Sequence, residues 1–171
     1  AEYYVRTIGA LWAIETVILR IFNAYGPGQN LPVSHPPVIP RFLKQALGGG
    51  SLVVFGGGGQ TRDFVYIDDV VDALVAAGTA PDVDRRVINV GSGLETSVTA
   101  LVALISEITG RPMEVLHSPA ESGGVSRLCA DIAVARKLLK YEPRMNLADG
   151  LRLTLERDPR FQRQWPHPST S

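Results

Sequence analysis

The chain has 171 residues, a formal net charge of zero, and apolar side chains at 45% of positions, which is typical of one globular domain with a core. Neutral charge removes the basic field that steers proteins to nucleic acid or anionic membranes, so neither is expected as a partner. No apolar run is long enough to span a bilayer.

The first part of the chain predicts alternating helices and strands. Helical spacing of Tyr4, Ile8 and Leu11 predicts an opening helix that lacks its own capping residue. The next predicted elements are a buried strand at 15–22, a turn at 23–28, a helix at 39–47, a strand at 52–55, a glycine turn at 56–59, an extended segment at 64–67, and a helix capped by Asp68 or Asp69.

The second part continues the alternation. The predicted elements are a strand at 86–90, a helix at 98–108 ended by Gly110, a strand at 113–116, a loop at 118–127, a helix capped by Asp131, a helix capped by Asn146, and a loose tail after Pro159. This order predicts an α/β protein with parallel strand pairing. Because such sheets bind ligands at the carboxyl ends of their strands, Asn23 and Gly91-Ser92-Gly93 are expected on the ligand side.

The cysteine and histidine content argues against two kinds of site. One cysteine, Cys129, excludes an internal disulfide and favours a reducing cytoplasm. Its thiol is either a nucleophile or a small buried filler, and the filler is favoured because no base is placed beside it. The three histidines are far apart in sequence, so we expect no metal site. The first residues lack the basic and apolar regions of a signal peptide.

The glycine runs match no phosphate-binding motif. Neither the P-loop pattern nor the G-x-G-x-x-G spacing occurs, so the run at 56–59 is interpreted as a mobile turn rather than a phosphate cradle. No tyrosine has a lysine four residues later, the acid/base pair of many hydride-transfer enzymes. Asp68 and Asp69 form either a carboxylate pair for acid/base chemistry or a helix cap, and the cap is favoured.

Arg62 and Asp63, beside the glycine turn, have two interpretations. A guanidinium forms a planar fork suited to phosphate oxygens, and flexible glycines allow a ligand to approach the backbone. Alternatively, Arg62 and Asp63 form a surface pair of small energetic value. The residue types alone leave both interpretations open.

A series of segments resembles the C-terminal part of the NAD-dependent epimerases/dehydratases, which are extended short-chain dehydrogenases/reductases, and especially enzymes of the UDP-glucose 4-epimerase kind. In order, the segments are LRIFNAYGPGQ at 19–29, VIPRF at 38–42, VFG at 54–56, QTRDFVYIDDV at 60–70, NVGSG at 89–93, and AD at 130–131 leading into the helix at 135–139. The resemblance implies the C-terminal portion of a Rossmann-type fold: a small substrate-binding α/β subdomain with one or two strands of the parallel sheet. Residues 1–158 would form this portion, and 159–171 a flexible tail.

The resemblance also implies binding roles at the end of the first strand. Asn23 would hydrogen-bond the diphosphate of a sugar nucleotide and also lie at the cofactor. Phe22 would lie near the nicotinamide of NAD.

Further substrate contacts are implied downstream. Val38 would offer backbone contacts, Val53 and Phe55 would line the nucleobase slot, and Arg62 would clamp the diphosphate. A UDP-sugar is therefore the expected partner.

The chain departs from the family pattern in two ways. The family's NAD-binding half, with its glycine-rich turn and Tyr-x-x-x-Lys pair, is absent, so we expect no catalytic residue in this chain and no retained NAD. The loop that usually carries R-x-G-D has Glu121 in place of the arginine and Gly124 in place of the aspartate. A carboxylate beside a diphosphate weakens binding by like-charge repulsion, which Arg127 would offset.

The leading hypothesis is the sugar-nucleotide-binding part of an NAD-dependent nucleotide-sugar epimerase, whose intact relatives transiently oxidise the sugar at C4. The alternatives are part of a nucleotide-sugar 4,6-dehydratase or decarboxylase, and a non-catalytic binding or interaction module. Open strand edges and the apolar opening helix predict self-association or a missing N-terminal partner half.

Overall fold

The computed structural model describes residues 1–118 and 125–165, apart from the side chain of Phe55, and has an α/β architecture with parallel strand pairs. The strands are β1 (Val17–Ile21), β2 (Asn23–Tyr25), β3 (Leu52–Phe55), β4 (Thr61–Arg62), β5 (Phe64–Tyr66), β6 (Arg86–Val90), β7 (Thr96–Ser97) and β8 (Val115–Ser118). The helices are α1 (Glu2–Trp12), α2 (Val38–Gly48), α3 (Ile67–Thr79), α4 (Val98–Thr109), α5 (Ala133–Leu139), α6 (Leu147–Arg157) and α7 (Pro159–Gln162).

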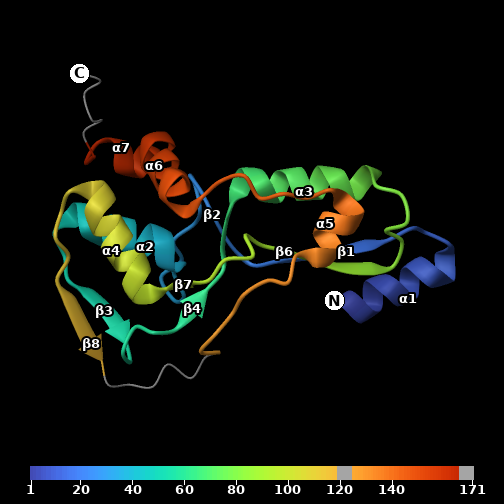
Figure 1. The fold of residues 1–171 in the computed structure, drawn as a ribbon, viewed down its shortest axis with the longest axis horizontal. Helices are drawn as coiled ribbons and strands as arrows, with labels where there is room; N and C mark the ends of the chain where they lie inside the picture. The colour runs from blue at the N-terminus through green and yellow to red at the C-terminus, as the bar shows by residue number, and fades with distance from the viewer. Residues whose placement is uncertain (119–124, 166–171) are drawn as a thin grey trace.

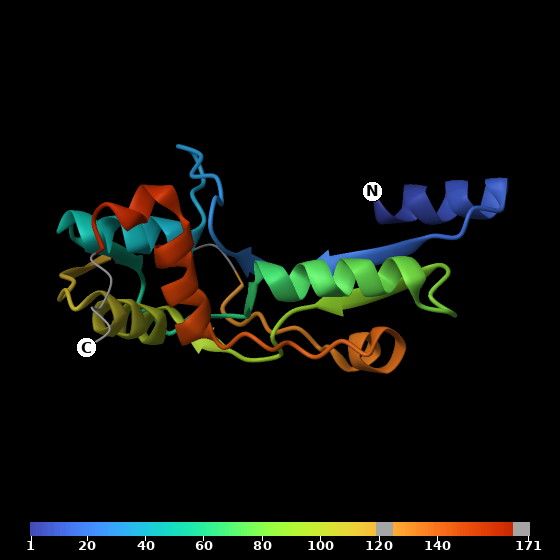
Figure 2. The ribbon, with the colours of Figure 1, turned by 90° about the horizontal axis from the view of Figure 1, so that it is seen from above.

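One region of the molecule is built on the parallel pair β1–β6. Helices α3 and α5 pack on this pair, while α1 lies apart from them at the far end of the molecule (Figures 1 and 2). Along β6, Ile88 and Val90 are fully buried and alternate with less buried neighbours, as a half-covered strand requires. The core here is Val65, Val70, Ala73, Ala77, Ile88, Val90, Ala130, Ile132, Ala135, Leu139 and Tyr141.

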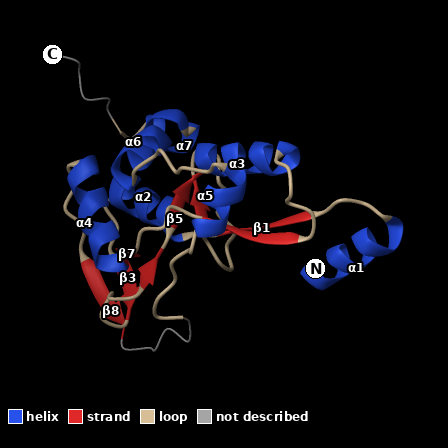
Figure 3. Ribbon diagram, turned by 45° about the vertical axis from the view of Figure 1, so that its right-hand side comes forward, coloured by secondary structure: helices blue, strands red, loops and turns tan. Residues whose placement is uncertain are grey.

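The second region gathers α2, α4, α6 and α7 beside the parallel pair β3–β8 (Figures 1 and 3). Phe42, Leu43, Leu101 and Ile105 form the centre of its core, at the helical spacing that the sequence shows. The short pairs β2–β5, which is parallel, and β4–β7, which is antiparallel, lie between the two regions. This junction positions the candidate site.

Several predicted elements are confirmed. The opening helix, the helices at 39–47 and 98–108 and the strands at 52–55 and 86–90 all occur within a residue or two of their expected bounds. Gly49 and Gly110 end α2 and α4 in the left-handed conformation that favours glycine. Asn146 caps α6 by accepting from the amide of Asp149.

Other predictions differ from the structure. Residues 23–25 are not part of a turn but form β2, because they pair with 64–66 in parallel register. The strand at 15–22 is not fully buried, and Ile21 is 43% exposed. Neither Asp68 nor Asp69 caps α3, which begins at Ile67.

Residues 159–165 also differ from the predicted loose tail. Residues 159–162 form α7, and Phe161 and Trp165 are buried in the core of the second region. The side chain of Asp158 caps α7 by accepting from the amide of Arg160. Burial of two aromatic side chains holds this segment in place despite its polar composition. None of the helices in the described segments has the length and hydropathy of a membrane span.

Candidate functional site

A cavity of about 250 Å³ lies at the junction of the two regions. It brings together four of the predicted site residues, Asn23, Val38, Val53 and Arg62, from four different elements. The remaining lining residues are Arg41, Phe42, Val54, Gln60, Phe64 and Val98. Among the described residues, the lining is apolar apart from two amides and two guanidinium groups, and it contains no carboxylate.

Asn23 is held in place by the strand beside it. It begins β2 opposite Phe64, and its Nδ2 donates to the carbonyl oxygen of Asp63 at 3.0 Å. This bond orients the amide and uses only one of its two N–H groups. The other N–H and the Oδ1 atom remain for a ligand.

Arg62 ends β4 and is half-buried in the cavity wall. Its Nη1 donates to the carbonyls of Thr61, at 2.7 Å, and Val125, at 2.9 Å. In the described part of the chain no carboxylate pairs with it, so the guanidinium keeps its full charge toward a ligand.

Val38 opens α2, whose N-terminus faces the same cavity. Pro37 precedes the helix and provides no side-chain cap. The first N–H groups of an uncapped helix attract anions because they have no partner within the helix. Val38 can therefore contribute its backbone N–H, as the resemblance implies.

The structure places the other predicted site residues differently. Val53, on β3, is 42% exposed and forms part of the wall. Phe55 is in the same strand by its backbone, and its side chain lies outside the described part of the chain. Phe22 lines an adjoining cavity of about 390 Å³, which shares Asn23 and Val38 with the first. Glu121 and Gly124 also lie outside the described residues.

Asp63 does not form the surface pair with Arg62 that the sequence left open. It is fully buried and accepts four hydrogen bonds from nitrogen and oxygen donors: Ser92 N and Oγ, both at 2.7 Å, and Gly93 N and Ala130 N, both at 3.0 Å. These bonds join the Gly91–Gly93 turn and the segment before α5 to the strand that carries Arg62. Asp63 thus fixes the backbone of the cavity wall.

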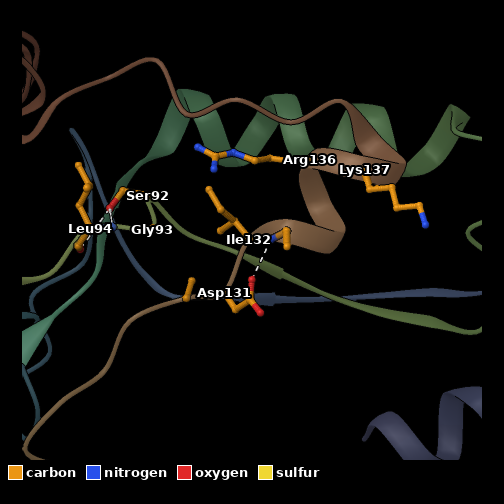
Figure 4. Close-up of a pocket in the computed structure, with 9 residues that line it drawn as sticks. Ser92, Gly93, Leu94, Asp131, Ile132, Arg136 and Lys137 are labelled. Atoms are coloured by element: carbon orange, nitrogen blue, oxygen red, sulfur yellow. Dashed lines mark hydrogen bonds between the residues drawn. The ribbon is translucent and has the colours of Figure 1, made fainter.

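The Ser92-Gly93 turn borders a different and larger cavity of about 730 Å³, also lined by Leu94, Ala130, Asp131, Ile132, Ala133, Arg136 and Lys137 (Figure 4). Asp131 accepts from the amide of Ala133 at the start of α5, and Lys137 points away from Ser92 in Figure 4. None of the predicted site residues lines this cavity. The two expected ligand-side segments therefore meet through Asp63 rather than at one cavity.

Cys129 is half-buried, with its Sγ 4.0 Å from Oδ2 of Asp63. Burial, and secondarily the Asp63 charge, raise the pKa of the Cys129 thiol. A raised pKa keeps the thiol neutral and disfavours the nucleophile interpretation. Across residues 1–118 and 125–165 no group of three or more metal-ligating side chains occurs.

The sequence of this chain is similar to that of known proteins. Residues 1–91 match the model of the NAD dependent epimerase/dehydratase family. The UDP-glucose 4-epimerase of Mycolicibacterium smegmatis is 36% identical over 91% of this chain and 49% of its own length. The chain belongs to this epimerase/dehydratase family. The UDP-N-acetyl-alpha-D-glucosaminuronate decarboxylase of Bacillus cytotoxicus is 32% identical over 86% of the chain and 47% of its own length.

The fold comparison agrees with the sequence comparison. The crystal structure of the Thermotoga maritima UDP-glucose 4-epimerase with UDP-glucose superposes with a TM-score of 0.85 and 34% identity, over 95% of this chain and 50% of that one. The chain spans about half the length of the relatives it matches, and it corresponds to their C-terminal part. The predicted fold, the C-terminal portion of an epimerase of the Rossmann type, is confirmed.

Proposed function

We propose that this chain is the sugar-nucleotide-binding part of a nucleotide-sugar epimerase of the UDP-glucose 4-epimerase kind. The observation that carries the proposal is the single cavity at which Asn23, Val38, Val53 and Arg62 meet. Arg62 and Asn23 bind the diphosphate, and the uncapped start of α2 adds backbone N–H groups. The apolar wall that includes Val53 receives the nucleobase.

The NAD of the family fits this chain only in part. Phe22 and Asn23 line the cavity beside the sugar-nucleotide cavity, and we propose that they contact the nicotinamide. The sequence has no glycine-rich turn for the dinucleotide phosphates and no Tyr-x-x-x-Lys pair for proton transfer. We therefore assign no step of the reaction to NAD on this chain, and we propose that the chain alone does not retain it.

Replacing Arg62 by alanine is expected to weaken UDP-glucose binding by about tenfold to a hundredfold, because a desolvated charged hydrogen bond contributes roughly 1.5–3 kcal/mol. Isothermal titration calorimetry of both proteins measures the change. Arg86→Ala removes an exposed arginine remote from the cavity and serves as the control, with unchanged affinity expected. Equal affinity of Arg62→Ala and wild type, or no binding to wild type, would contradict the proposal.

A second candidate function is favoured by the decarboxylase relative, which matches the same part of this chain. Its substrate carries a carboxylate on the sugar, as its name states. The same calorimetry with UDP-glucose and UDP-glucuronic acid separates the two. Preference for the uronic acid would favour part of a decarboxylase, and preference for UDP-glucose favours the epimerase.

We also propose that the chain self-associates through α1. Gly9 is the one residue of this helix that is buried, while Tyr3, Tyr4, Leu11 and Trp12 are each at least 69% exposed. Light scattering is expected to give a mass above the 18.5 kDa of one chain, because exposed apolar faces of this kind associate. Leu11→Glu with Trp12→Glu should shift the mass toward one chain. A monodisperse wild type of 18.5 kDa at all concentrations would contradict self-association.

A further inference from the structure

Arg41 lies on the wall of the sugar-nucleotide cavity, although it was not among the predicted site residues. It follows Val38 by three positions on α2, so the two side chains share one face of the helix. Phe42, the next residue, also lines the cavity, and the Arg41 guanidinium carbon lies 5.1 Å from the centre of its ring. Arg41 thus places a second guanidinium on the wall of the cavity that Arg62 also lines.

The guanidinium of Arg41 has an unmet hydrogen-bonding group. Its Nε atom is buried and has no hydrogen-bond partner among the described residues. Burial also lowers the pKa of Arg41, which marks a cation that has lost solvent. An unpaired buried donor on a cation is costly unless another group compensates for it.

Eight arginines of the described chain pair with carboxylates, whereas Arg41 and Arg62 do not. The pairs include Arg20–Glu2, Arg127–Glu95, Arg144–Asp72, Arg152–Asp149 and Arg160–Asp158. Within residues 1–118 and 125–165, no carboxylate lines the cavity that Arg41 and Arg62 share. The cavity therefore carries two positive charges in a chain whose net charge is zero.

We propose that Arg41 is a second anion-binding residue of this cavity and presents its guanidinium group to a phosphate oxygen of a nucleoside diphosphate. The inference rests on the proposed function. It deepens that proposal because two guanidinium groups, rather than one, bind the negatively charged diphosphate. A diphosphate carries several negative charges and many acceptor oxygens, so it can satisfy both arginines and the N–H groups at the start of α2. An uncharged nucleoside has no group that matches this arrangement.

The test compares UDP with uridine by calorimetry. Arg41→Gln is expected to weaken UDP binding by about tenfold, the loss typical of one charge-assisted hydrogen bond, and to leave uridine binding within about twofold. Arg41→Lys keeps the charge and loses the planar guanidinium fork, so it should recover only part of the UDP affinity. Lys44→Gln removes an exposed charge from the same helix and should change neither affinity.

The outcomes separate this inference from the proposed function. If wild type binds no UDP, both are overturned. If wild type binds UDP and Arg62→Ala weakens binding while Arg41→Gln does not, the inference on Arg41 alone is overturned. Equal weakening of UDP and uridine would also overturn it, because it indicates a change of cavity shape. Should Arg41→Gln fail to fold in a thermal melt, Arg41→Lys decides: UDP affinity equal to wild type overturns the inference.

Discussion

Asp63→Asn should lower the free energy of unfolding by about 4 kcal/mol, the largest effect expected from a single change in this chain. The carboxylate accepts from two donors of Ser92 and from the amides of Gly93 and Ala130, and it is fully buried. An asparagine keeps an acceptor oxygen on one side only and turns an N–H₂ group toward the two donors on the other side, so those two donors lose their acceptor. Urea unfolding followed by circular dichroism measures the change.

Asp68→Asn is the matched control, because its side chain is 61% exposed and its nearest cation, on Arg157, is 3.7 Å away. Its expected change is less than about 0.5 kcal/mol. A loss below about 1 kcal/mol for Asp63→Asn would show that the Gly91–Gly93 turn does not depend on this carboxylate. The structural account of the cavity wall would then be wrong.

Asp158→Ala should lower the free energy of unfolding by about 3 kcal/mol at neutral pH. Asp158 is fully buried, pairs with Arg160 at 2.6 Å and accepts from the amide of Gly28 at 2.8 Å. It thereby ties the loop that leads to α2 to the start of α7. The hydrogen bonds from Arg160, with the amide of Gly28, lower the pKa of Asp158 to about 2.

The pH dependence of this effect has a definite sign. A carboxylate whose pKa is lower in the folded state than its ordinary value of 3.8 stabilises the fold above that value. This stabilisation disappears as the pH falls from about 4 toward 2. Urea midpoints of wild type and Asp158→Ala should therefore differ most at pH 5–7 and converge below pH 4. A difference that does not change with pH would contradict the assignment.

The sequence predicted the elements whose signals are local. Helices α2 and α4 have a regular apolar face and a glycine immediately after it, and strand β6 is a short apolar run. It did not predict β2, because Asn23 to Tyr25 have a turn-like sequence context and become a strand only by pairing with residues 64–66, about forty positions later. The same holds for α7, whose polar segment is fixed by the burial of Phe161 and Trp165.

The sequence predicted only part of the site, because some of its residues depend on partners that are distant in sequence. Asn23, Val38, Val53 and Arg62 were assigned by resemblance to the family, and the structure brings them to one cavity. Asp63 was missed because its partners lie 29 to 67 residues away and none is charged. Its neighbour Arg62 suggested a surface pair instead.

Arg41 was missed because its importance lies in a group without a partner. Only the structure shows that its Nε is buried and has no partner among the described residues. The same structure shows that Arg41 lines one cavity with Arg62. For Asp69, in contrast, the sequence did not reveal the partners that the structure shows. Two carboxylates at a helix start predicted a cap, but Asp69 instead accepts from the amides of Arg144 and Met145, 75 and 76 residues later.

A crystal structure of the chain with UDP tests the central claim most directly, because it locates the ligand without relying on a variant. The account predicts the diphosphate within hydrogen-bond distance of Asn23 and Arg62, with the uracil against the wall that includes Val53. UDP bound instead at the larger cavity beside Ser92 and Lys137, or no UDP at saturating concentration, would contradict it.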